Sequence, residues 1–239
     1  MKLSILKTAL ALAVSGGLTV QAGIYNYNGS AYNIPDGNPS GPYSQITVSG
    51  EASSLSDISV AINVSGGYNG DLYAYLSYNG ALVPLLNRVG VGSAPSTTSA
   101  VGCSDSGLHL VLSDSGAHGD IHLYQQVSGY ASLIANGTST WTPDGRNINP
   151  SSSSRVDFDT AAGSRLGLDT TFGGMNPNGT WTLFFADVSG GGGTSTVNGW
   201  SLDITAVPEP VNVALGLFGA LFAGVSAVRW RLNRKAGSA

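Results

Sequence analysis

The chain has 239 residues, of which 42% are hydrophobic and only 10% are charged, and its formal net charge at neutral pH is −4. This mild negative charge excludes the usual kind of nucleic-acid binder, which needs a strongly positive face. Low charge combined with 8% aromatic residues also excludes a long disordered chain. The single cysteine, Cys103, cannot form a disulfide within the chain, and we expect a buried, unreactive thiol.

The first 22 residues have the features of a secretory signal peptide. Lys2 and Lys7 give a positive start, a short apolar stretch follows, and Val20 and Ala22 are the small residues that signal peptidase requires. The apolar stretch is too short for a permanent membrane span. We therefore expect an exported protein, with signal peptidase as a processing partner that cleaves between Ala22 and Gly23.

Residues 23–45 are expected to form an extended lead-in strand, and residues 46–206 a single β-rich domain. Within this domain, apolar residues alternate with other residues in four segments, with the period of two that half-buried strands show. These segments are 58–64, 72–77, 181–186 and 200–205. Turn pairs such as Asn79-Gly80 separate them. Short strands with regular turns predict an all-β fold, a jelly-roll-like β-sandwich.

The middle of the chain, residues 91–154, is rich in Ser and Gly, and we expect loops whose role stays open. Within it, 108–112 and 121–127 are candidate strands. His118 and His122 are four residues apart, which on a strand separates them by roughly 13 Å and prevents them from sharing a metal ion. We therefore expect two solvated histidines and no zinc site.

Candidate metal ligands are five aspartates: Asp71, Asp157, Asp159, Asp187 and Asp203. Calcium takes about six to eight oxygen ligands, often from several loops. Asp side chains equally cap turns by accepting main-chain N–H bonds. The sequence therefore predicts no cofactor, with a structural calcium ion near Asp71 and Asp187 as an open alternative.

Catalytic motifs are missing from the sequence. The chain has no Gly-x-Ser-x-Gly elbow, and its three histidines fall in one segment, 109–122. The glycine run 190–193 lacks the Lys-Ser or Lys-Thr that follows in a phosphate-binding loop. We expect no enzymatic activity.

Six tyrosines are candidates for a carbohydrate-stacking platform: Tyr25, Tyr27, Tyr32, Tyr43, Tyr73 and Tyr75. Aromatic rings offer apolar faces with a polar tip, which suits sugars. Tyr73 and Tyr75 fall on the strand face opposite Leu72 and Leu76, so we expect them to point outward. Cross-strand pairing explains them more simply, and we favour it.

The C-terminal segment, 207–239, has three parts in a fixed order. Pro208-Glu209-Pro210 comes first, then the uncharged stretch 211–228, then a basic tail over 229–235. At about 1.5 Å per residue, about 18 residues reach roughly 27 Å, close to a bilayer core of about 30 Å. We expect one transmembrane helix whose basic tail stays cytoplasmic. The basic residues that fix this topology are Arg229, Arg231, Arg234 and Lys235.

This arrangement resembles the PEP-CTERM sorting signal of Gram-negative bacteria. The resemblance implies that Pro208, Glu209 and Pro210 are recognised by an exosortase-like membrane protease. It also implies a protein that is anchored briefly at the inner membrane and then passes to the cell surface or extracellular matrix. Proteins with this signal are often tied to exopolysaccharide or biofilm.

Three segments of the body resemble the P domain of proprotein convertases, also called the P/Homo B domain. They are Gly-Asp-Leu at 70–72, Val-Asp-Phe-Asp-Thr-Ala-Ala at 156–162, and Asn-Pro-Asn-Gly-Thr-Trp-Thr-Leu at 176–183. The resemblance implies a jelly-roll β-sandwich. In convertases this domain packs against a subtilisin-like catalytic domain and stabilises it, and no such catalytic domain fits in this chain.

Taken together, the sequence predicts an exported, exosortase-processed, non-enzymatic surface or matrix protein associated with exopolysaccharide. The alternative is an accessory module that stabilises or regulates a separate extracellular subtilisin-like protease.

Overall fold

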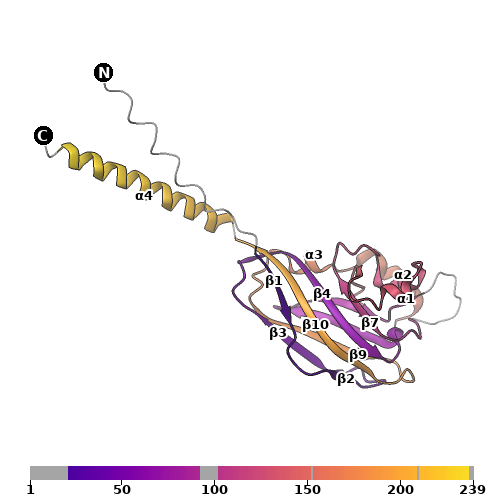
Figure 1. Ribbon diagram of the computed structural model, residues 1–239. Coiled ribbons are helices and arrows are strands. Elements are labelled where there is room, and N and C mark those ends of the chain that lie inside the picture. The colour runs from indigo at the N-terminus through magenta and orange to yellow at the C-terminus, as the bar shows by residue number, and fades with distance from the viewer. Residues whose placement is uncertain (1–20, 92–101, 152, 209, 237–239) are drawn as a thin grey trace.

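The computed structural model describes residues 21–91, 102–151, 153–208 and 210–236, without the side chains of 21, 210–213 and 231–236. Its strands form two sheets that enclose one hydrophobic core (Figure 1). Sheet A runs β1 (Gln21–Asn26), β10 (Ser195–Val207), β4 (Ser54–Gly66), β7 (Leu108–Leu112) and β8 (Thr140–Trp141), with β2 (Tyr32–Ile34) also paired to β10. Sheet B runs β3 (Tyr43–Val48), β9 (Gly179–Asp187), β5 (Leu72–Tyr78) and β6 (Ala81–Asn87).

Alternating burial explains why these segments are strands. In β4, Ile58, Val60, Ile62 and Val64 are buried, and the residues between them are not. The same alternation is seen in β5, β9 and β10, where the predicted inward residues lie in the core. One face of each sheet thus covers the other sheet, as in a sandwich. The prediction of an all-β, sandwich-like fold is confirmed at this level.

The turn between β5 and β6 shows how local sequence sets the register. Asn79 has φ of 49° and Gly80 has φ of 82°, the left-handed conformations that a two-residue type I′ turn requires. Asn and Gly adopt these angles at lowest cost. The turn places Tyr78 opposite Ala81 and aligns the rest of the hairpin.

The segment expected to be a lead-in forms part of the sandwich. β1 pairs with β10, β2 pairs with the start of β10, and β3 is an edge of sheet B. The Tyr27 ring stacks on Trp200 at 6.4 Å, and the Tyr32 hydroxyl lies 2.9 Å from Ser44 Oγ. Aromatic packing of this kind attaches the segment to the core although its sequence alternates weakly.

Between β6 and β9 lies an insert that contains most of the helical turns. Its helical segments are η2 (Ile121–Gln126), α1 (Tyr130–Leu133), α2 (Arg155–Ala161), η3 (Ala162–Ser164) and α3 (Leu168–Phe172), while η1 (Asn69–Asp71) precedes β5. The strand predicted at 108–112 is confirmed as β7. The strand predicted at 121–127 was wrong, because the Asp120 side chain accepts the main-chain N–H of His122 at 3.0 Å and starts a 3₁₀ turn there.

The C-terminal helix, α4 (Pro210–Ala236), extends away from the two sheets (Figure 1). Large apolar side chains along it are exposed, including Phe218 at 61% and Phe222 at 73%. In the part of the chain that the structure describes, no helix is both long enough and apolar enough to cross a membrane.

Candidate functional site

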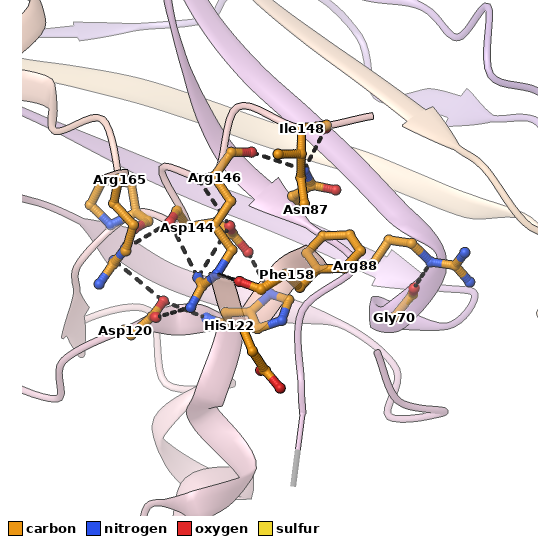
Figure 2. A network of polar contacts seen from close by, with 12 residues as sticks. Gly70, Asn87, Arg88, Asp120, His122, Asp144, Arg146, Ile148, Phe158 and Arg165 are labelled. Atoms are coloured by element: carbon orange, nitrogen blue, oxygen red, sulfur yellow. Dashed lines mark hydrogen bonds and ion pairs between the residues drawn. The ribbon is translucent and has the colours of Figure 1, made fainter. Parts of the chain in front are cut away.

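Two groups of charged residues are candidate sites, and most of their members are buried or half-buried, with Asp36 as the exposed exception. The first, here called the insert cluster, consists of Asp120, His122, Asp144, Arg146 and Arg165 (Figure 2). His122 and Asp144 are fully buried, and His122 Nδ1 lies 2.7 Å from Asp144 Oδ2. The expectation of a solvated His122 was therefore wrong, because the insert folds over it.

Arg146 connects the members of the insert cluster. Its Nη2 donates to Asp120 Oδ2 at 2.8 Å, and its Nη1 lies 3.3 Å from Asp144 Oδ1. Its Nε donates to the main-chain oxygen of Phe158 at 3.0 Å. Burial by itself lowers the pKa of Arg146, but the hydrogen bond to Asp120 and the charge of Asp144 outweigh burial and raise it. The guanidinium therefore stays charged and holds α2 to the loop after β8.

The remaining contacts close the cluster against solvent. The Phe158 ring stacks on His122, with centroids 5.2 Å apart. Arg165 donates to the main-chain oxygen of Asp144 at 2.8 Å and lies 3.3 Å from Asp120 Oδ1. The Nε2 atom of His122 is buried without a hydrogen-bond partner among the described residues. A general base must reach its substrate, and a fully buried histidine cannot do so. We therefore assign His122 a structural role, in which it holds the loops of the insert together.

The second group, here called the acidic loop site, consists of Asp36, Asp71 and Asp187, with Arg88 beside them. Asp187 ends β9 on the inner face of sheet B and is fully buried. Its Oδ1 accepts the N–H groups of Gly37 at 3.3 Å and Ser189 at 3.1 Å. Its Oδ2 is buried and has no hydrogen-bond partner in the part of the chain that the structure describes.

Electrostatics at the acidic loop site are unfavourable for the carboxylates. Burial, followed by the charge of Asp187, raises the pKa of Asp71, although Arg88 opposes the shift from 3.5 Å away. Burial also raises the pKa of Asp187, and the charge of Asp36 adds to this. Within the described ranges, no group of three or more His, Cys, Asp or Glu side chains is arranged to hold a metal ion by itself.

The other predicted aspartates and His118 have ordinary structural roles. Asp157 and Ser154 form a capping box at the start of α2. Asp159 pairs with Arg155 at 3.1 Å, and Asp203 is exposed on β10. The His118 ring packs beside Trp141, with centroids 5.1 Å apart.

A third feature is an aromatic patch on the outer face of sheet B, here called the sheet B patch: Tyr43, Tyr73, Tyr75 and Phe184. Phe184 lies opposite Tyr43 on one side and Tyr75 on the other, so the rings cross three strands in register. The rings of Tyr75 and Phe184 stack at 4.8 Å, and Tyr43 is 66% exposed.

The sheet B patch contains only Tyr43, Tyr73 and Tyr75 of the six tyrosines considered for a carbohydrate-stacking platform. Tyr25, Tyr27 and Tyr32 belong to the edge of sheet A and do not join it. The Tyr25 hydroxyl donates to Glu51 at 2.6 Å, and burial together with this bond raises the pKa of Tyr25 to about 12. Six tyrosines therefore do not form one platform, and cross-strand pairing describes Tyr75 with Phe184.

The predicted processing residues lie at the junctions of the fold. Ala22 and Gly23 are in β1, and Pro208 follows β10. Glu209 lies outside the described residues. Pro210 starts α4 and Arg229 is exposed on it, whereas Arg231, Arg234 and Lys235 belong to α4 with side chains outside the described ones. Their roles in sorting, cleavage and topology stay predictions.

No protein-family model matches the chain, and no curated protein does. Among solved structures, a complex of an Aeromonas sobria serine protease with the chaperone is similar, at 16% identity and a TM-score of 0.40. A structure of the serine protease of Aeromonas sobria is similar at 14% identity and a TM-score of 0.39. They cover 81% and 80% of this chain, which spans only 28% and 27% of theirs. The fold itself defines the class: a two-sheet, predominantly antiparallel β-sandwich with a helical insert.

Proposed function

We propose that this protein is an exported, non-catalytic module that binds a separate extracellular subtilisin-like protease through the sheet B patch. The observation that carries the proposal is the row of aromatic rings that crosses β3, β9 and β5, in which Tyr43 is 66% exposed and Tyr73, Tyr75 and Phe184 are half-buried. Tyr and Phe are enriched at protein interfaces, where large rings gain contact area at low entropic cost. The protease partner is suggested by the resemblance of 70–72, 156–162 and 176–183 to convertase P domains.

The chemistry of the patch favours a protein over a sugar. Tyr75 and Phe184 stack face to face, with planes 18° apart, so their ring faces cover each other. A sugar needs a free ring face, whereas an apolar protein surface can pack on ring edges. Neighbouring side chains such as Gln45 and Thr182 are polar and uncharged, which suits the rim of a docking surface.

Capture of a serine protease tests this proposal. The tagged full-length protein is incubated with culture supernatant of the source bacterium, and bound serine proteases are detected with a fluorophosphonate probe. We expect a labelled protease that is lost with the Tyr43→Ser/Tyr75→Ser double variant. The matched control is Ile24→Ser, since Ile24 is also 66% exposed but lies on sheet A. No labelled protein, or equal capture by both variants, would refute the proposal.

A second proposal concerns delivery and rests on α4. Its exposed apolar side chains, after Pro208-Glu209-Pro210 and before the basic tail, favour anchoring at the inner membrane and processing by an exosortase-like protease. The final location would be the cell surface or an exopolysaccharide matrix. This proposal is compatible with the first, because it concerns the cellular location of the protein, whereas the first concerns its binding partner.

Processing can be followed directly in the source bacterium. Glu209→Gln is expected to leave an unprocessed membrane form on an immunoblot, while the wild type is shortened. Mass spectrometry of the wild-type C-terminal peptide gives an independent reading. A mature protein that still ends at Ala239 would exclude exosortase processing.

A further inference from the structure

Asp187 is the most unusual buried group in the described part of the chain. Its neighbours along the inner face of β9, Leu183 and Phe185, belong to the hydrophobic core. A carboxylate at the next inward position is costly unless its charge is compensated. Oδ1 is satisfied by two main-chain N–H groups, but Oδ2 is buried and has no hydrogen-bond partner among the described residues. Oδ2 is therefore a candidate ligand for a cation.

Three loops meet around this carboxylate. Asp71 ends η1 at the start of β5, and its main-chain oxygen accepts the N–H of Val188 at 2.8 Å. Asp36 lies in the β2–β3 loop and accepts the N–H of Gly191 at 3.1 Å. The three aspartates thus come from separate parts of the sequence, and hydrogen bonds fix the loops that carry them.

The charges of this group do not balance. Its less exposed part contains the carboxylates of Asp71 and Asp187 and the guanidinium of Arg88, with a formal sum of −1, and the exposed carboxylate of Asp36 adds a further negative charge beside them. Arg88 lies 3.5 Å from Asp71 Oδ1, and its Nε donates to the main-chain oxygen of Gly70. It partly neutralises Asp71 and makes no ion pair with Asp187, so the negative charges of the site exceed its positive charge.

We infer that Asp71 and Asp187 bind a calcium ion, with main-chain carbonyl groups and water completing its coordination. Too few acidic side chains converge here to form the whole ligand set, and calcium accepts carbonyl and water oxygens readily. Magnesium demands a stricter octahedral geometry, which adjustable glycine-rich loops do not impose. Asp36 contributes charge and holds the β9–β10 loop through Gly191.

The space beside the Asp71 carboxylate is consistent with a bound calcium ion. A Cβ atom on Gly192 would lie 2.9 Å from Asp71 Oδ2 and 2.9 Å from the Tyr68 ring, so only glycine leaves this approach open. The Tyr68 ring therefore lies beside the carboxylate that is to bind the ion. This position provides a local optical reporter, because a nearby tyrosine can transfer excitation energy to a bound lanthanide.

The first test measures thermal unfolding of the full-length protein with EDTA, CaCl₂ or MgCl₂. Extracellular calcium modules bind with Kd on the order of 10⁻⁴ M, so 10 mM calcium should raise Tm by about 5–10 °C. Asp187→Asn and Asp71→Asn should each lose this rise. Asp203→Asn is the matched control, because it removes an exposed aspartate from β10 and should keep the rise.

The second test uses Tb³⁺ as a calcium substitute. Excitation of tyrosine should produce terbium emission that calcium displaces, and Tyr68→Phe should weaken the emission while leaving the calcium-induced rise in Tm unchanged. The inference is overturned if calcium leaves Tm unchanged, if magnesium acts equally well, or if Asp203→Asn behaves like Asp187→Asn. It is independent of the protease proposal, which these measurements do not address.

Discussion

The insert cluster and the acidic loop site both bury charged groups, yet they compensate them differently. The insert cluster has two carboxylates and two guanidinium groups, all in contact with an opposite charge. The acidic loop site has three carboxylates, one of them exposed, and one guanidinium, and one buried carboxylate oxygen has no partner among the described residues. Burying charge is costly in both places. The first region compensates the cost within the chain, whereas the second leaves it for a ligand.

The unsatisfied atoms of the two regions also differ in kind. In the insert cluster the atom without a partner is Nε2 of His122, a ring nitrogen packed beside Phe158. In the acidic loop site it is an oxygen of Asp187. An unpaired neutral atom costs about 1–3 kcal/mol, and an unpaired charge costs more. Substitutions that remove charge should therefore act in opposite directions at the two places.

Arg146→Ala should give the largest effect. It leaves the buried carboxylate of Asp144 with less compensation and removes the bond to Phe158. We expect the free energy of unfolding to fall by about 3–5 kcal/mol, measured by urea denaturation. A loss under about 1 kcal/mol would mean that the cluster does not hold the insert.

Asp144→Asn should cause the next largest loss of stability. The amide keeps the shape but weakens the bonds to His122 and Arg146, so we expect a loss of about 2–3 kcal/mol. The same urea experiment measures it. An unchanged or higher stability would show that the ion pairs contribute nothing net.

Asp187→Asn is the same chemical change in the acidic loop site. It should change the free energy of unfolding in the opposite direction to Asp144→Asn. In calcium-free buffer the amide Oδ1 still accepts from Gly37 and Ser189, while the uncompensated charge is removed. We expect the free energy of unfolding to rise by about 1 kcal/mol. A loss as large as that of Asp144→Asn would show that the two regions are not different in kind.

Cys103 reports on the border of the acidic loop site, because its main-chain oxygen accepts the N–H of Gly70. Burial raises the pKa of the Cys103 thiol from 9.0 to about 11. The folded protein thus holds this proton more tightly than the unfolded chain, so its contribution to stability is complete below pH 9 and is lost as pH rises through about 11. At pH 9, alkylation by iodoacetamide should be about fifty-fold slower in native protein than in urea. Equal rates would contradict a protected thiol.

Arg155→Ala should have the smallest effect and serves as a baseline. Arg155 pairs with the exposed Asp159 four residues later on α2. Such surface pairs contribute about 0.3–0.5 kcal/mol, and the loss should shrink further in 1 M salt. A loss comparable to that of Arg146→Ala would remove the distinction between buried and surface pairs.

Four strands of the sandwich, β4, β5, β9 and β10, were predictable because burial leaves a period of two in the sequence. Ile58, Val60 and Ile62 show it in β4, and Trp200 and Leu202 show it in β10. The lead-in was predicted as one extended strand outside the domain. Its division into β1 and β2 within the sandwich was missed, since their attachment depends on pairing with β10 and on ring contacts such as Tyr27 with Trp200. Such contacts over long sequence distances leave no periodic signal.

The insert cluster was missed for a related reason. Asp120 contacts His122 locally, but Asp144 is 22 residues away in loop-like sequence, and only the tertiary fold brings Asp144 and Arg146 to this cluster. The usable signal was the chain of apolar residues around His122, which indicates burial but not the partner. Asp71 and Asp187 were singled out from the sequence because each borders a strand, but the unpaired Oδ2 of Asp187 could be found only in the structure.

The pairing of β1 with β10 brings the start of β1 next to the end of β10. Gln21 lies opposite Ala206, so the first described residue and the C-terminal end of β10 lie at the same pole of the sandwich. The start of β10, where β2 and the aspartate-bearing loops meet, is the opposite pole. With 13 residues at about 3.3 Å each, β10 separates the poles by roughly 40 Å. An attachment through α4 therefore holds one pole of the sandwich. The loops that carry Asp36, Asp71 and Asp187 then lie at the opposite pole, away from the point of attachment.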